Sequence, residues 1–296
     1  MSAPIVVGYT ATEAGEDAVA LGARLAAASG SELCIVVVLP ADTRSVITPP
    51  DASYDHYLEQ QAAEWLARAA AQAGDIVPVR TLIRYGDSFA EGLGDAVAEV
   101  GASHLVVGAA NGGLRGRHRL GTVASELLHS AEVPVVLAPE GSRRIDPSAG
   151  ISRITAAIGT RPGTEALLHA STALAAATGA ELRLLSLVSV DLPASVDTGV
   201  IRIAGAAHAE DVLSKALAEL PDGVEADVVV ARGDSIEDAV SQLSWEPGEL
   251  AIVGSSRLAQ PRRLFLGSTA AKILHELPVP MVVVPKTAKT QEGEQR

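Results

Sequence analysis

The 296-residue sequence has little cysteine, few positive charges and no long hydrophobic run. Cys34 is the single cysteine, which excludes an internal disulfide framework and a Cys-x-x-Cys metal or redox site. The 23 basic residues are outnumbered by 36 acidic ones, so the formal net charge is −13. Because a surface that coats nucleic acid needs clustered cations, we expect no nucleic-acid partner.

The apolar stretches are too short for a membrane span. The Ala-rich segments are interrupted by Glu, Arg or Asp well before about 18 residues, and the start lacks a charged segment followed by an apolar one. We therefore expect no membrane partner, no signal peptide and a cytoplasmic location. Apolar residues make up 48% and charged residues 20%, a balance typical of compact globular chains, and the length suits two domains of about 150 residues.

The sequence is a tandem duplication. Four landmarks return in the same order, at an offset that falls from 149 to 146 residues: LAAASGSEL (25–33) and LAAATGAEL (174–182), RYGDS (84–88) and ARGDS (231–235), LGT (120–122) and LGS (266–268), LLHSAEVPVV (127–136) and ILHELPVPMV (273–282). The shrinking offset indicates that the second copy has lost a few residues in its connections. A repeat of this length predicts two similar domains.

Within each copy, short Val-rich runs alternate with amphipathic stretches. In the first copy this pattern predicts strands at 5–9, 33–39, 77–85, 104–107 and 135–138, and helices at 13–28, 54–73, 88–100 and from residue 122. The matching helices of the second copy are expected to begin near residues 163, 204, 235 and 268. Such alternation predicts an α/β fold of two doubly wound domains, each a five-stranded, mainly parallel sheet with helices on both faces and a ligand crevice at the carboxyl ends of the strands.

The domain boundaries follow from composition. Residues 141–152 are polar, contain Gly and Pro and lack periodicity, so they are expected to link a first domain at 1–140 to a second at 153–286. The last residues, 287–296, form a polar tail that is expected to be disordered. Two segments that begin with proline, 134–138 and 280–284, are expected to be edge strands through which the two halves pack.

One loop has the composition of a phosphate site. The segment VVGAANGGLRGRHRLGT (106–122) leads from a strand through Gly and Arg residues to Gly121-Thr122 at a helix start. Backbone N–H groups, a hydroxyl and the positive end of a helix dipole meet there, and Arg115, Arg117 and Arg119 add positive charge. The alternative is that Thr122, and Ser268 in the second copy, are ordinary N-caps beside a solvated loop.

The chain resembles the universal stress protein family in its tandem two-domain form, over about residues 4–139 and 153–285. The resemblance lies in the strand, the Gly-x2-Gly-x9-Gly-Ser/Thr loop, and the LLH segment and strand that follow. The resemblance implies a Rossmann-like fold of the adenine nucleotide alpha hydrolase-like type. It also implies a role in stress response, in a family with members that bind ATP and members that do not. The residues that it places in a first-copy ATP site, with or without Mg²⁺, are Gly8, Thr10, Val38, Val107, Gly108, Asn111, Gly121, Thr122 and Val123.

Both copies depart from the family's nucleotide pattern. An acidic residue at the end of the first strand is replaced by Thr10 and, in the second copy, by Gly159. Asn111 stands at the second glycine position of the first copy, where asparagine tolerates a left-handed turn. The second copy keeps Gly254, Gly267 and Ser268 but has Arg257 at that position. Together with Arg262 and Arg263, it leaves open an anion or a different phosphorylated ligand there. We therefore expect ATP chiefly in the first copy.

No catalytic or metal-binding set is evident. The seven histidines lack ligand spacing, Cys34 lies in an apolar strand, and Asp87 and Asp234 are expected to cap a helix or its first turn. At most, slow ATP hydrolysis is expected. Two hypotheses follow: a nucleotide-binding stress protein that acts through a protein partner, as an intramolecular pseudo-dimer or a further homodimer, or a nucleotide-independent interaction protein whose sites have degenerated.

Overall fold

The computed structural model describes residues 2–41, 52–109, 120–159, 164–189, 199–255 and 266–285. The first half contains β1 (Ile5–Gly8), α1 (Glu13–Ser29), β2 (Leu33–Pro40), α2 (Ala52–Ala73), β3 (Val79–Gly86), α3 (Phe89–Val100), β4 (His104–Gly108), α4 (Thr122–Ser130) and β5 (Val135–Ala138). The second contains β6 (Arg153–Ala157), α5 (Thr164–Thr178), β7 (Glu181–Ser189), α6 (Gly199–Ala218), β8 (Asp227–Gly233), α7 (Ile236–Ser241), β9 (Glu249–Gly254), α8 (Ser268–Glu276) and β10 (Met281–Val284). The predicted order of strands and helices is therefore confirmed.

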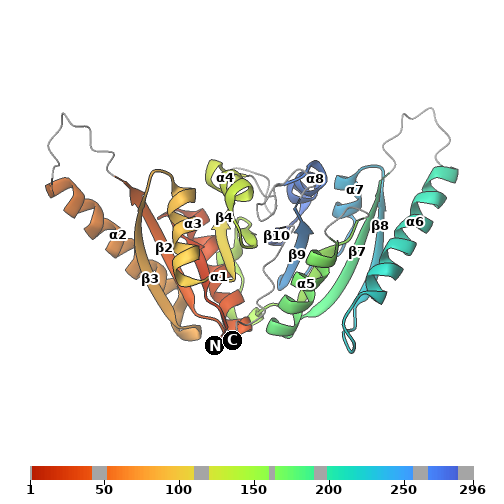
Figure 1. Ribbon diagram of the computed structural model, residues 1–296, viewed down its shortest axis with the longest axis horizontal. Helices are drawn as coiled ribbons and strands as arrows, with labels where there is room; N and C mark the ends of the chain where they lie inside the picture. The colour runs from red at the N-terminus through yellow and green to blue at the C-terminus, as the bar shows by residue number, and fades with distance from the viewer. Residues whose placement is uncertain are drawn as a thin grey trace, which may run out of the picture.

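The ten strands form one continuous sheet, in the order β3-β2-β1-β4-β5-β10-β9-β6-β7-β8 (Figure 1). Pairing within each half is parallel, as expected for strands joined by helical crossovers. At the centre β10 pairs antiparallel with β5, with Met281 opposite Leu137 and Val283 opposite Val135. The two segments that begin with proline thus join the two sheets.

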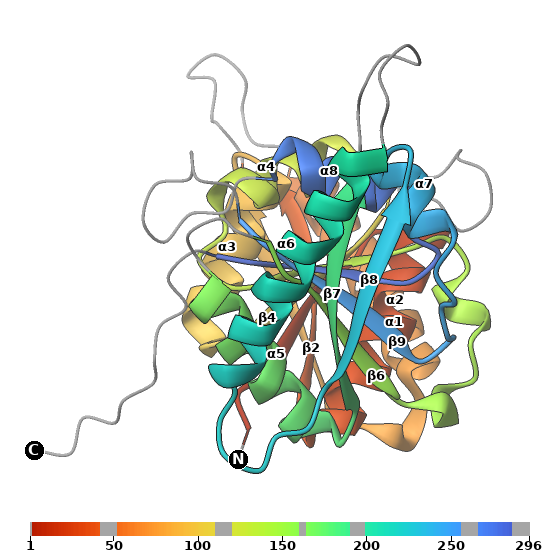
Figure 2. The ribbon, with the colours of Figure 1, turned by 90° about the vertical axis from the view of Figure 1, so that its right-hand side faces the viewer.

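Two apolar cores cover the two faces of this sheet. One contains side chains from α1, α2, α5 and α6, and the other contains side chains from α3, α4, α7 and α8. The strands feed both cores because alternate residues point to opposite faces: Val7 belongs to the first core and Val6 to the second. Helices α2 and α6 lie at the two ends of the molecule, beside the edge strands β3 and β8 (Figures 1 and 2). Each core extends across both halves.

The connection between the halves is packed against α1. It contains two short 3-10 turns, Ser142–Arg144 and Pro147–Ala149. The buried carboxylate of Asp17 accepts hydrogen bonds from the backbone N–H of Gly141 (3.1 Å) and Arg143 (2.9 Å) and from the Arg143 guanidinium (2.8 Å). Arg143 also bridges to Glu13 at 2.9 Å. These bonds fix the start of the second half to the first helix.

The second half has a buried charge network centred on Glu249. The Glu249 carboxylate, 0% exposed, accepts hydrogen bonds from Arg153 (2.6 Å), Arg183 (2.5 Å) and the Thr155 hydroxyl. The Arg183 guanidinium stacks over Trp245, 5.1 Å from the ring centroid. Helix α7 has six residues where its counterpart α3 has twelve, so this network and Trp245 lie at the starts of the strands, where the shorter helix ends.

No helix among the described residues is long and apolar enough to cross a membrane.

Candidate functional site

The first-copy site residues meet at the carboxyl ends of β1 and β4, under the start of α1. A Cβ on Gly108 would lie 2.1 Å from the Ala14 carbonyl oxygen, and one on Gly15 would lie 1.9 Å from the Thr10 carbonyl oxygen. Both neighbours are backbone atoms, so no side chain fits at either position. The glycines therefore let α1 begin directly against the strand ends, as a wall of closely packed backbone.

Apolar side chains lie beneath this wall. Val107 is buried, and Val38 is half-buried against α3, where a Cβ on Gly92 would lie 2.6 Å from the Val38 Cγ1 atom. A Cβ on Gly8 would lie 2.6 Å from a Leu93 methyl and 3.2 Å from a Val107 methyl. The predicted residues Gly8, Val38 and Val107 are thus brought together, as part of the core beneath the strand ends.

The helix that follows the glycine-rich loop begins without a side-chain cap. Gly121 is the N-cap of α4, with φ −74° and ψ 169°, and Gly267 is the N-cap of α8, with φ −72° and ψ 164°. The alternative in which Thr122 and Ser268 are N-caps is therefore wrong, because each is the first helical residue. Being glycines, Gly121 and Gly267 provide no side-chain cap, and among the described residues the first backbone N–H groups with the helix dipole suit an anion.

The end of β1 carries hydroxyl groups in place of a carboxylate. The Thr10 and Thr12 hydroxyls are 3.0 Å apart, and Thr12 caps α1 by accepting the Gly15 backbone N–H at 3.3 Å. In the second half Gly159 has no side chain, and its carbonyl accepts a hydrogen bond from the Thr164 hydroxyl at 3.1 Å. At the strand end itself, the first half therefore has the Thr10 hydroxyl where the second has a glycine.

The N-caps of α3 and α7 are serines, which corrects the expectation that Asp87 and Asp234 cap these helices. Ser88 and Ser235 are the N-caps, each accepting the backbone N–H three residues on, from Glu91 and Asp238, at 3.1 Å. Asp87 and Asp234 precede the caps and donate backbone N–H groups to the carboxylates of Glu91 (3.1 Å) and Asp238 (3.0 Å). This bond from the Asp234 N–H lowers the pKa of Asp238. The Ser-x-x-Glu and Ser-x-x-Asp patterns of the sequence are those of a capping box, with the carboxylate bonded to the N–H of the residue before the cap.

Sequence reasoning missed Glu126, which lies one turn into α4. Its carboxylate accepts a hydrogen bond from the Ser88 hydroxyl at 3.0 Å, so it is held between the starts of α3 and α4. The internal repeat provides a signal for this residue, because the equivalent position in α8 is Lys272. The two candidate sites thus carry opposite charges at one matched position.

Some predicted residues lie outside the described parts of the chain: Asn111, Arg115, Arg117, Arg119, Arg257, Arg262 and Arg263. Val123 lies in the first turn of α4, and Gly254 ends β9, as Gly108 ends β4.

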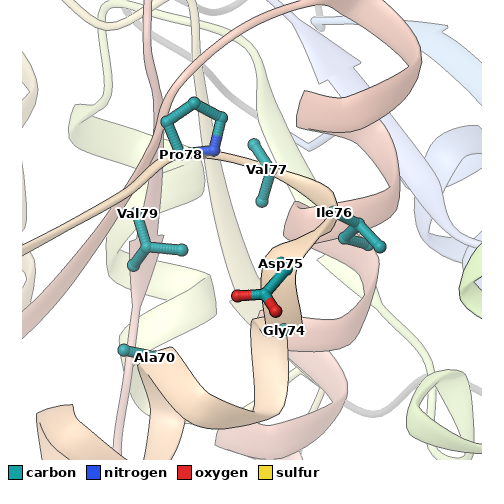
Figure 3. Close-up of a pocket in the computed structure, with 7 residues that line it drawn as sticks. All are labelled: Ala70, Gly74, Asp75, Ile76, Val77, Pro78 and Val79. Atoms are coloured by element: carbon teal, nitrogen blue, oxygen red, sulfur yellow. The ribbon is translucent and has the colours of Figure 1, made fainter.

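A hollow of about 510 Å³ lies elsewhere, around the turn between α2 and β3 (Figure 3). Asp75 is the one ionisable residue in its lining, which is otherwise formed by Ala70, Gly74, Ile76, Val77, Pro78 and Val79. The hollow adjoins the start of β3, whereas a doubly wound sheet binds ligands at the carboxyl ends of its strands. It is therefore separate from the candidate site.

Two buried ionisable side chains of the described residues have shifted pKa values, and they lie away from the candidate site. Within the described ranges, no three His, Cys, Asp or Glu residues are grouped so as to hold a metal ion. Burial raises the pKa of the Cys34 thiol to about 11, which keeps it protonated and unreactive. Burial also lowers the pKa of His104, at the start of β4, to about 4. Both groups lie at the opposite end of their strands from the candidate site.

The family model described as the universal stress protein family matches residues 1–139 and 150–285. A universal stress protein of Mycobacterium tuberculosis is 29% identical over 297 residues, covering 95% of this chain and 99% of the relative, and one of Mycobacterium bovis matches equally. A universal stress protein structure from Archaeoglobus fulgidus superimposes with a TM-score of 0.65 at 18% identity, over 97% of this chain and 100% of that one, and so shares the fold. Because the family model covers both halves, the chain belongs to the universal stress protein family and contains two copies of its domain.

Proposed function

We propose that this protein binds an adenine nucleotide, ATP, chiefly in its first domain, and acts through a protein partner rather than by turnover. The observation that carries the proposal is that α4 begins at Gly121 without a side-chain cap. In the same half, the backbone of Gly108 lies directly against the Ala14 carbonyl. The first leaves backbone donors open for phosphate, and the second shapes the strand ends against which a nucleoside would lie.

The first domain is favoured over the second by its polar groups. The Thr10, Thr12 and Thr122 side chains are exposed and carry hydroxyls that can donate or accept. At the matching end of β6, the described residue Gly159 has no side chain and its carbonyl is already bonded to Thr164. The Thr10 hydroxyl therefore supports the first domain as the main nucleotide site.

Action through a partner follows from the chemistry of the described residues. A hydrolase needs a base or a metal ion beside the phosphate. The strand ends and helix starts of the first site present hydroxyls, backbone N–H groups and valines, together with carboxylates that are bonded to Ser88 and the α3 cap. Binding without rapid turnover suits a sensor that a second protein reads.

The alternative is a nucleotide-independent interaction protein. Its support is the replacement of the first-strand carboxylate by Thr10 and Gly159, together with Arg257 at the second glycine position of the second copy.

Calorimetric titration with ATP and Mg²⁺ decides between them, after bound nucleotide has been stripped and identified by mass spectrometry. We expect saturable binding of about one ATP per chain, lost in Gly121→Val and kept in the matched variant Gly267→Val. Absence of both heat and co-purified nucleotide in folded protein favours the interaction protein. Loss of binding in Gly267→Val alone would place the main site in the second domain.

A further inference from the structure

The sheet ends in two outer strands, β3 and β8, each of which pairs on one side only among the described residues. In β2 the Leu33 N–H donates to the Pro78 carbonyl at 2.9 Å. Because alternate residues of a strand bond to the same neighbour, the backbone groups of Thr81 and Ile83 face outward. The repeat places Val228 of β8 at the position of Thr81, and Figure 2 shows β8 along its length beside α6. Both edges therefore present backbone groups that a further strand can bond.

Exposed apolar side chains gather at the same two ends of the molecule. Of the six large apolar side chains that are exposed among the described residues, five belong to α2, β3 and their connecting turn or to α6 and β8: Tyr57, Ile76, Tyr85, Leu217 and Val228. Helices α2 and α6 lie at opposite ends in Figure 1 but on one face of the sheet, since both contribute to one core. The hollow at the α2–β3 turn adds an apolar recess at the first end (Figure 3). Apolar surface concentrated in this way is typical of an interaction site.

The two ends differ in the sign of their charge. Residues 72–86, which include β3, have a net charge of +1, and the equivalent residues 219–233, which include β8, have a net charge of −3. Within the strands, the exposed Arg80 aligns with the exposed Asp227. Two β3 edges would bring arginines together and two β8 edges would bring acids together, which is unfavourable in a sheet. A β3 edge against a β8 edge joins opposite charges instead.

The directions of the strands determine how these edges can meet. Because β10 pairs antiparallel with β5, the strands of the second half run opposite to those of the first. A second molecule placed beyond β8 in the same orientation therefore sets its β3 antiparallel to β8, with equivalent cores on the same side. One register sets Thr81 of that molecule opposite Val228. Asp227 then falls diagonally between Arg80 and Arg84.

We infer that β8 of one molecule pairs with β3 of a second molecule, head to tail, so that the two sheets continue into each other. The partner of each edge is thus the opposite edge of the same protein, which it matches in backbone groups, apolar side chains and charge. Since the contact joins unlike surfaces, each added molecule leaves one edge of each kind open, and chains of molecules form rather than a closed dimer. This association requires no nucleotide and so stands apart from the proposed function.

Charge reversal tests this pairing. Reversing one charge pair at about 6 Å in water changes the association constant about tenfold. Asp227→Arg and Arg80→Asp are therefore each expected to weaken association about tenfold. The double variant is expected to restore most of it, because opposite charges then face each other again. The matched controls are Glu132→Arg, before β5, and Arg144→Asp, in the linker, which are exposed and change the net charge equally.

A backbone variant tests the same edge without changing its charge. Thr81→Pro removes an outward N–H and keeps the bonds to β2, since proline is tolerated on an edge strand. We expect it to abolish the association. Circular dichroism and thermal melting establish that this variant and the charge variants are folded.

The assay is sedimentation equilibrium of the full chain at physiological salt, from about 1 µM to about 1 mM. The mass of the wild type is expected to rise with concentration beyond that of a dimer. A mass of one chain at every concentration overturns the inference and assigns the edge charges to keeping molecules apart. A closed dimer also overturns it, as does association that Asp227→Arg and Glu132→Arg change equally. Association that Thr81→Pro leaves intact shows that another surface holds the molecules together.

Discussion

His104 makes the stability of the first domain sensitive to mild acid. Its ring lies at the start of β4, a strand between β1 and β5, and its Nδ1 atom is 3.1 Å from the Ser103 hydroxyl. Burial lowers its pKa from 6.5 to about 4 because the charged form loses its hydration. The unfolded chain therefore binds a proton between these pH values that the folded chain does not.

The sign of the effect follows from linkage. Since the folded-state pKa lies below the unfolded value, stability is complete above pH 6.5 and falls as the pH drops toward 4. A shift of this size corresponds to about 3 kcal/mol across that window. The matched variant is His104→Leu, because the repeat places Leu250 at the same position of β9.

The assay is urea unfolding of wild type and His104→Leu at half-unit steps from pH 4 to pH 8, with an NMR titration of the His104 ring. The difference in unfolding free energy should change by about 3 kcal/mol in favour of the variant between pH 6.5 and 4, and stay level above pH 7. Loss of the Ser103 contact adds a constant offset. A difference that is flat from pH 4 to 8, or a ring that titrates near 6.5, would refute the reasoning.

Two further perturbations test the packing. Glu249→Gln leaves the buried Arg153 and Arg183 without their shared carboxylate, so the unfolding free energy should fall by about 3–5 kcal/mol in urea melts. The control is Glu246→Gln, which removes a half-exposed ion pair and should lower the unfolding free energy by less than about 1 kcal/mol. Equal losses in the two variants would contradict the role of burial. Gly108→Ala should lower the unfolding free energy by about 1–3 kcal/mol because its Cβ meets the Ala14 carbonyl. Gly94→Ala has open space around it in α3 and should raise the unfolding free energy by about 0.5–1 kcal/mol. A Gly108→Ala variant as stable as wild type would show that α1 can move away.

The fold was predictable because it follows from the hydrophobic periodicity of the segments and from the internal repeat. The short Val-rich runs at 33–39 and 135–138 could only be buried strands, and their alternation with helices required parallel pairing. The join between the halves was also predictable, since a strand that begins at proline belongs at an edge. The structure places that edge opposite the matching edge of the second copy.

The buried charges could not be predicted from the same patterns. Asp17 and Arg24 occupy polar positions of an amphipathic helix, which a periodic pattern assigns to solvent. They are buried because the second half and its linker lie over them: Asp17 is bonded to Gly141 and Arg143, and Arg24 donates to the Pro247 carbonyl at 3.5 Å. Contacts between segments more than 120 residues apart leave no trace in local sequence.

The site was predictable in part. Glycine spacing identified Gly108 and Gly121, whose roles depend on backbone geometry. The cap assignments were wrong for Asp87 and Asp234 because an aspartate next to a serine offers two candidates, and only the backbone φ and ψ decide which one is the N-cap. Glu126 was missed because its partner Ser88 lies 38 residues away in sequence.

The pairing of β5 with β10 changes how the two copies can evolve. In a symmetric homodimer one strand must match itself, and every substitution appears on both sides of the interface at once. Here the two strands belong to one chain, whose tether keeps their effective concentration high. Each copy is thereby released from self-complementarity and can acquire its own substitutions. The Glu249 network and the inversion between Glu126 and Lys272 are differences that a symmetric pair of identical chains has no means to hold.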